Sequence, residues 1–348
     1  MVRAIIRRRP INWTFHRRGI CRAIRPTLAS LERRRETSGA SPIALNTSTP
    51  KVALKGCAGL MVGIVGSVSC LAIDYQPGDW VPLPPNTGVL MGYYEFGTRN
   101  EYNNTITGTA KNNTHLDSNI GIARYLYYNE VFHHPYVLDF IVPFGALTHG
   151  EINGKNLGSA SGLGDPIVSA GFWFINQPKQ RRYLSAVDFL TLPLGTYDSQ
   201  KALNLGGNRW QNDVQVDFTQ GFLNKFTIDV SGDWIYYWNN TDFGAEHETL
   251  SQDSTFSAYV WLSYDIRSVL RTQLPANVSI GYAGTFGGIQ KLDGINTGQK
   301  AGEQQIRFTY SQFVTPTWQF LISVTHDVSV SGQFKQDFGL VLRVTKLF

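Results

Sequence analysis

Cysteine is nearly absent from this chain of 348 residues, and its three copies, Cys21, Cys57 and Cys70, all lie before residue 73. The other 276 residues therefore offer neither a disulfide framework nor a thiolate metal site. Long apolar runs are missing as well, since no stretch after residue 72 approaches the roughly 18 residues of a membrane-spanning helix. A membrane protein of this composition must be a closed β-barrel, because only a barrel satisfies its backbone hydrogen bonds in lipid without helices.

Acidic residues are scarce in the first 50 residues, which hold eleven arginines, no lysine and only Glu32 and Glu36 as acids. We interpret residues 1–50 as a leader that takes no part in the fold. Two origins are open: upstream codons translated because the start was assigned too early, or an Arg-rich organelle transit peptide. The first is favoured because a complete signal peptide follows.

That signal peptide occupies residues 51–72. Lys51 and Lys55 give it a charged start, an apolar stretch follows, and Cys70-Leu71-Ala72 resembles a small-x-small cleavage site. Lipidation of Cys70 is an alternative that Ser67 fits poorly.

The apparent surplus of basic residues belongs to these 72 positions. They contain 13 of the 31 Lys and Arg residues but only two of the 26 Asp and Glu residues. Residues 73–348 keep 18 basic and 24 acidic residues, which gives a net charge of −6. The overall basicity is therefore no evidence for nucleic-acid binding, and no nucleic-acid partner is expected.

Strict alternation of apolar and polar residues is the strongest pattern in the sequence, and it is clearest from Trp210 to Trp238. One parity carries Val214, Val216 and Phe218, while the other carries four aspartates. Such a period of two over about ten residues indicates strands and excludes helices. Apolar residues facing lipid, polar residues facing a lumen and aromatic residues at the strand ends are typical of a transmembrane barrel hairpin.

The same logic predicts an all-β, antiparallel, up-and-down transmembrane barrel over residues 88–348. Residues 73–87 contain four prolines and cannot pair as a central strand, so they form either a periplasmic segment or a plug in the lumen. Long polar loops alternate with short turns, as in bacterial outer-membrane barrels. Twelve strands are expected, at residues 88–98, 116–128, 134–146, 165–176, 182–194, 210–222, 225–238, 254–266, 276–287, 303–313, 317–327 and 336–348.

Two details concern individual positions in these strands. Phe348 ends an alternating strand and resembles the terminal aromatic signal by which outer-membrane barrels are recognised for insertion, although Lys346 departs from that signal. Arg124 shares its parity with Ile120, Ile122 and Leu126. This parity places an arginine toward lipid, at a cost of ~2 to 4 kcal/mol near the midplane. Either Arg124 lies near an interface or the register of this strand differs.

Three glycine-rich motifs stand at strand ends: residues 162–166 (Gly-Leu-Gly-Asp-Pro), 192–198 (Leu-Pro-Leu-Gly-Thr-Tyr-Asp) and 203–210 (Leu-Asn-Leu-Gly-Gly-Asn-Arg-Trp). Together with the proline-rich residues 83–85, the chain resembles the family described as the putative MetA pathway of phenol degradation. The resemblance covers about residues 74–348. It implies an outer-membrane channel or transporter, often associated with the catabolism of aromatic compounds, and it supplies neither a defined substrate nor a catalytic motif.

The polar parity of the strands predicts which side chains line the lumen. Its acids either form a passage that concentrates cations or pair with arginines in a solvated interior. Tyr259 and Trp261 either stack on an aromatic solute or fill a narrow barrel. The expected pore-lining residues are Asp139, Asp213, Asp217, Asp229, Asp233, Tyr259, Trp261, Asp265, Arg307, Asp327, Asp337 and Arg343.

No catalytic, cofactor-binding or metal-binding residue is expected. The His133-His134 pair lacks the spacing of a convincing metal site. We therefore expect a non-enzymatic channel for passive uptake of small, aromatic or hydrophobic solutes through the bacterial outer membrane, with lipid and the barrel-insertion machinery as further partners. The alternatives are a membrane-embedded hydrolase, for which Ser323 and His326 have opposite parity, and a structural or adhesive barrel that transports nothing.

Overall fold

The computed structural model describes residues 75–348, so the expected leader and signal peptide lie outside the described residues. Twelve long strands pair antiparallel with their neighbours in the chain, and the last pairs with the first to close a barrel. The predicted fold and strand number are confirmed. The barrel strands are β1 (Thr87–Asn104), β3 (His115–Val131), β4 (His134–Ile152), β6 (Ile167–Gln177), β7 (Arg182–Thr191), β8 (Gln211–Phe222), β9 (Phe226–Tyr237), β12 (Thr255–Asp265), β13 (Ala276–Gly287), β16 (Gly302–Thr315), β17 (Trp318–Ser331) and β18 (Phe334–Leu347).

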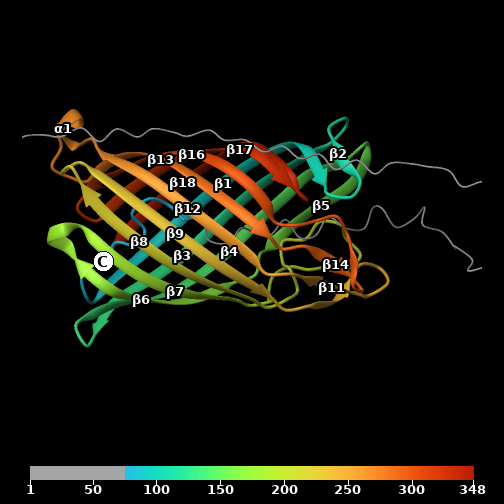
Figure 1. Ribbon diagram of the computed structural model, residues 1–348, viewed down its shortest axis with the longest axis horizontal. Coiled ribbons are helices and arrows are strands. Elements are labelled where there is room, and N and C mark those ends of the chain that lie inside the picture. Colours follow the sequence, from blue (N-terminus) through green and yellow to red (C-terminus); the bar gives the residue numbers. More distant parts are fainter. Residues whose placement is uncertain (1–74) are drawn as a thin grey trace, which may run out of the picture. The chain divides into compact units, whose positions relative to one another are not determined.

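Short and long connections lie at opposite ends of the barrel (Figure 1). The short end, which we assign to the periplasm, carries tight turns, the 3-10 turn η1 (Pro178–Gln180) and the single-turn helix α1 (Arg267–Leu270). The outer end carries β2 (Gly108–Ala110), which pairs with β1, and β5 (Lys155–Leu163), which pairs with β4. A separate small sheet is formed there by β10 (Asn240–Phe243), β11 (Glu248–Gln252), β14 (Gln290–Leu292) and β15 (Ile295–Asn296).

The hairpin of β8 and β9 shows why these segments form strands. Its aspartates point inward and are buried, whereas Val216, Val230 and Trp234 point outward and are exposed. Val216 pairs with Gly232, and the two strands meet at a tight turn after Phe222. This is the alternation that the sequence predicts, and in lipid the outward apolar side chains need no partner.

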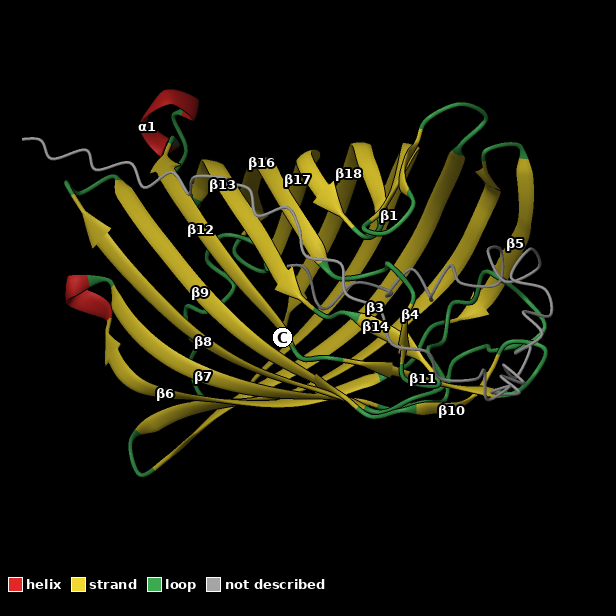
Figure 2. Ribbon diagram, turned by 45° about the vertical axis from the view of Figure 1, so that its right-hand side comes forward, coloured by secondary structure: helices red, strands yellow, loops and turns green. Residues whose placement is uncertain are grey.

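The outer surface continues this pattern around the barrel. Exposed apolar or aromatic residues occur on every barrel strand except β7, whose outward Leu184 and Leu190 are half-buried. Figure 2 shows the strands running obliquely around the wall, as closure of a barrel requires. At the periplasmic rim, the Lys346 ammonium donates a hydrogen bond to Thr317 (2.8 Å) and lies 5.1 Å from the Trp318 ring centre. A cation over an aromatic ring at the interface explains how Lys346 is tolerated beside Phe348.

Of the two possibilities left open for Arg124, the second holds: the register of its strand differs, and its even positions face the lumen. The even positions of β3 are buried inside the barrel, and the Arg124 side chain is 3% exposed. Ile120 and Leu126, assigned to lipid by their hydrophobicity, therefore lie inside. The physical reason is that this part of the inner wall is apolar, so hydrophobicity does not mark the lipid face there.

Among the described residues, no helix is long and apolar enough to cross a membrane.

Candidate functional site

The inner wall formed by β8 and β9 carries four of the predicted pore-lining acids, each at most 7% exposed. Asp233 accepts hydrogen bonds from Gln215 (2.9 Å) and Ser231 (3.2 Å), and Asp229 accepts one from Thr219 (2.5 Å). Adjacent inward positions of a strand pair place these carboxylates in a ladder along the lumen. These partners are uncharged, so they orient Asp229 and Asp233 without neutralising them. The four acids are Asp213, Asp217, Asp229 and Asp233.

We expect this ladder to make the channel cation-selective. Changing all four aspartates to asparagine should move the reversal potential measured in a KCl gradient toward zero, because uncompensated carboxylates raise the local cation concentration. The matched control is Asp253→Asn, which removes an acid from an exposed loop pair with Lys291. Equal selectivity of the wild type and the fourfold variant would contradict the prediction.

Asp139 lies on β4, which β6 and β7 separate from β8, and it is paired with Arg124 of β3. The Arg124 guanidinium donates two hydrogen bonds to Asp139 Oδ2, from Nε at 3.0 Å and from Nη2 at 2.7 Å. Both side chains are almost fully buried, at 3% and 1% exposure. Asp139 is therefore part of a buried ion pair. This matches the alternative in which the lumen acids pair with arginines and stabilise the barrel.

Three further residues that the sequence predicts to line the pore are Asp327, Arg307 and Asp265. Asp327 is buried and accepts hydrogen bonds from the Gln305 side chain (2.7 Å) and the Gln336 backbone amide (2.7 Å). The Arg307 guanidinium lies 5.4 Å from the centre of the Tyr259 ring. Asp265 is at the periplasmic end of β12, where it pairs with Arg267 of α1.

Asp337 differs from the expectation that it lines the pore. The pairing of β1 with β18 skips this residue, since Thr98 pairs with Phe338 and Arg99 with Gln336. At this bulge the Asp337 carboxylate accepts hydrogen bonds from the backbone and side-chain amides of exposed Asn100, both at 2.9 Å. A bulge re-aims a side chain, and parity counted along β18 cannot detect it.

Residues 75–81 lie inside the barrel, in contact with inward side chains from several strands. Asp79 pairs with Arg343 at 2.7 Å, between Oδ1 and Nη1. The indole nitrogens of Trp173 and Trp261 donate hydrogen bonds to the Trp80 and Tyr75 carbonyl oxygens, at 2.9 Å and 3.2 Å. Of the two positions that the sequence left open for this proline-rich segment, its described part occupies the lumen.

An apolar and aromatic cluster surrounds this inserted segment. The Trp80 ring lies 6.4 Å from Trp173 and 6.1 Å from Phe189, and Tyr75 lies 5.9 Å from Tyr259. The cluster extends over the inner faces of β3, β4, β6 and β7 through buried aliphatic residues such as Val137, Ile141 and Val187. The cluster thus lies beside the acid ladder on the inner wall, because β7 pairs with β8 and β12 pairs with β9.

A cavity of about 180 Å³ lies toward the outer end, between β1, β16, β17, β18 and the long loops. Its lining combines charged groups, such as Arg99 and Arg307, with side-chain amides from Gln290 and Gln299. Aromatic surface is present as well, because Phe334 borders the cavity and packs against Tyr102 in a tilted arrangement, with ring centres 5.0 Å apart. Such a mixture suits a small solute with one apolar face.

A family profile described as "Putative MetA-pathway of phenol degradation" matches residues 90–344. The chain belongs to this family. An outer membrane channel from Pseudomonas putida F1 is 28% identical, with a TM-score of 0.73 over 79% of this chain and 100% of that chain. The translocator domain of the autotransporter NalP from Neisseria meningitidis is 9% identical, with a TM-score of 0.46 over 76% of this chain and 88% of that chain, and it carries no argument about function. No curated protein matches.

This member of the MetA family is accordingly an outer-membrane β-barrel with a channel or transporter role. Its three glycine-rich motifs, distant in sequence, meet at Asp165 in the connection between β5 and β6. The Asp165 carboxylate accepts hydrogen bonds from the Gly195 amide (2.8 Å) and the Gly207 amide (2.7 Å). A side chain at Gly195 would place its Cβ 2.7 Å from the Asp165 backbone nitrogen, so only glycine allows this approach.

Asp165 thereby holds the loop of residues 192–210 against the outer end of the lumen, where Leu203 and Leu205 are buried. Burial raises the pKa of Asp165, while the Gly207 and Gly195 amides act in the opposite direction by stabilising the carboxylate. The three glycine-rich motifs of this chain therefore form a structural clamp on an inserted loop.

Proposed function

We propose that this channel passively carries small single-ring aromatic or similarly apolar solutes from the outer cavity, through the lumen, to the periplasm. The observation that carries the proposal is the apolar and aromatic inner wall, which general porins, with their polar interiors, do not need. The outer cavity is comparable with cavities of about 150 Å³ that bind benzene. The description of the family, phenol degradation, supports the same solute class.

Residues 75–81 occupy the lumen, where Trp80 packs against Trp173 and Phe189 of the aromatic cluster. Passage therefore requires this segment to move or to yield at its edges. An aromatic solute can replace the contacts of Trp80 with Trp173 and Phe189, because its ring offers the same kind of surface. Trp173 and Phe189 would then contact the solute ring in place of the Trp80 ring.

Uptake into cells tests this proposal directly. In a Gram-negative host with intact lipopolysaccharide, expression of the chain should raise the initial uptake rate of labelled phenol more than that of glycerol. Phe334→Ala should reduce the phenol rate about two- to tenfold, because aromatic contacts contribute roughly 0.5–1.5 kcal/mol. Phe308→Ala is the matched control, since Phe308 is 56% exposed on the lipid face.

Phenol uptake that is not accelerated, in cells whose outer membranes contain the folded barrel, would refute the proposed solute class. Equal effects of the Phe334 and Phe308 substitutions would refute the proposed route through the outer cavity. Planar-bilayer conductance, measured in parallel, keeps the channel role separate from the choice of solute.

A further inference from the structure

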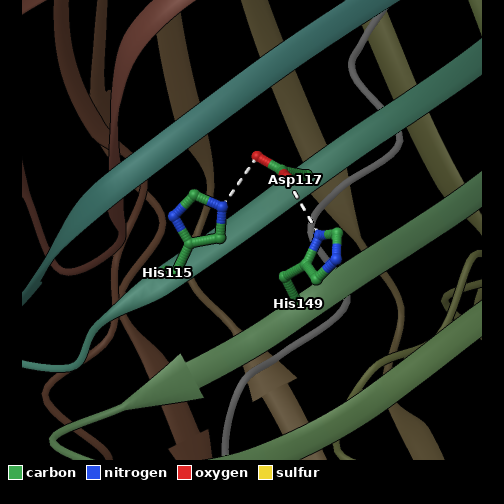
Figure 3. A group of neighbouring side chains, drawn as sticks. All are labelled: His115, Asp117 and His149. Carbon is green, nitrogen blue, oxygen red and sulfur yellow. Dashed lines mark hydrogen bonds and ion pairs between the residues drawn. The ribbon is translucent and has the colours of Figure 1, made fainter.

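Two histidines and an aspartate meet at the outer ends of β3 and β4 (Figure 3). His115 Nε2 lies 3.0 Å from Asp117 Oδ1, and His149 Nδ1 lies 3.0 Å from Asp117 Oδ2. One ligand atom from each residue falls within 4.8 Å of the others. In Figure 3 the two imidazole rings flank the carboxylate, with His115 and Asp117 coming from β3 and His149 from β4.

Two irregularities in the backbone bring these side chains together. The pairing of β3 with β4 shifts register between His115 and Asp117, and the pairing of β4 with β5 shifts between Leu147 and Gly150. His149 lies within the second irregularity and has φ of 56°, a left-handed conformation that is uncommon for a residue with a side chain. Strained, bulged positions of this kind often re-aim side chains at functional sites.

The hydrogen bonds of Asn100 determine which nitrogen of the His115 ring carries a proton. Asn100 Nδ2 donates to Asp337 Oδ2 at 2.9 Å, so the amide oxygen is the atom that faces His115 Nδ1 at 2.6 Å. His115 Nδ1 must therefore carry the proton, and in the neutral ring Nε2 carries a lone pair. That lone pair points at a carboxylate oxygen, and two acceptors 3.0 Å apart require a positive charge between or beside them.

We propose that His115 Nε2, the Asp117 carboxylate and His149 Nδ1 bind a divalent transition-metal ion of the zinc class. Two imidazoles and one carboxylate are common zinc ligands, and a site with three protein ligands leaves a position for water. Asn100 is the positioning residue, because its oxygen selects the tautomer that presents Nε2 to the metal.

The ligand atoms need only small side-chain rotations to reach an ion at about 2.0–2.2 Å. The site is accessible from outside, since the His149 side chain is 71% exposed. The metal would join β3 to β4 across the irregular register and so tie the outer rim of the barrel.

Calorimetric titration with zinc chloride tests the site. The full chain should be purified from membranes in detergent with a tag that contains no histidine, stripped with EDTA and dialysed at pH 7.5. We expect one zinc ion per chain, with no comparable binding in the Asp117→Asn/His149→Ala variant. Asn100→Ala should weaken binding about 10- to 100-fold, as loss of the partner that orients a ligand typically does.

His133→Ala is the matched control, because His133 lies in the turn at the other end of the same strand pair. It should bind zinc like the wild type. Folding of every variant is checked by its heat-dependent mobility on gels. In addition, cobalt added in place of zinc should give visible absorption bands that disappear in the Asp117→Asn/His149→Ala variant.

Zinc binding that survives in the Asp117→Asn/His149→Ala variant would overturn the proposal. A folded wild-type chain that binds no zinc at pH 7.5 would also overturn it.

Discussion

Changing Asp79 to asparagine should increase the single-channel conductance several-fold. Asp79 and Arg343 form an ion pair with side-chain exposures of 10% and 3%. Removing one partner of a buried pair leaves the other charge uncompensated, at a cost of about 3–5 kcal/mol. Since each ~1.4 kcal/mol is a factor of ten in an equilibrium constant, residues 75–81 should leave the lumen for a large fraction of the time.

The effect should appear in planar-bilayer recordings as longer or more frequent high-conductance events. Trp80→Ala, which removes the ring contacts with Trp173 and Phe189, should act in the same direction and add to the first change. Asp198→Asn is the matched control, because Asp198 makes an exposed 3.7 Å pair with Lys201 and such pairs contribute little. Unchanged conductance in the Asp79→Asn/Trp80→Ala variant would show that this segment is not the barrier.

The architecture of the barrel could be predicted from sequence because lipid imposes a local rule. Every second residue of a lipid-facing strand must be apolar. Val214, Val216 and Phe218 therefore indicate a strand without information from any distant residue. Long loops are likewise a local property of composition. Twelve strands and the placement of long and short connections therefore follow from patterns within about ten residues.

The interior obeys no such rule. Arg124 was misplaced because Ile120 and Leu126 are as apolar as a lipid face, although they pack inside the barrel. The insertion of Asp79 depends on Arg343, which is 264 positions away. The proline content of residues 73–87 alone was compatible with a periplasmic segment and with a plug in the lumen. The His115, Asp117 and His149 cluster depends on irregularities of register that no period of two contains. These features are decided by tertiary contacts.

The Arg124 and Asp139 pair should give the largest change in stability of any single substitution discussed here. Asp139→Ala leaves a guanidinium that is 3% exposed without its carboxylate, and the expected loss in the free energy of unfolding is about 3–5 kcal/mol. Urea unfolding of the barrel in lipid vesicles, followed by tryptophan fluorescence, measures this loss. Asp265→Asn is the control, because its pair with Arg267 is more exposed and should contribute about 0–1 kcal/mol.

The double variant Arg124→Met/Asp139→Leu separates the cost of an unpaired charge from the value of the pair. Replacing both members of a buried pair by apolar residues of similar volume is often neutral or stabilising, and here the neighbours include Ile141 and Val137 of the same apolar wall. The double variant should therefore regain most of the stability that Asp139→Ala loses. If it were as unstable as the single variant, the pair itself, with its hydrogen bonds to Asp139 Oδ2, would be a net source of stability. Recovery would instead show that the pair is not a net source of stability, and it would contradict the stabilising alternative at Asp139, the lumen acid that fits that alternative best.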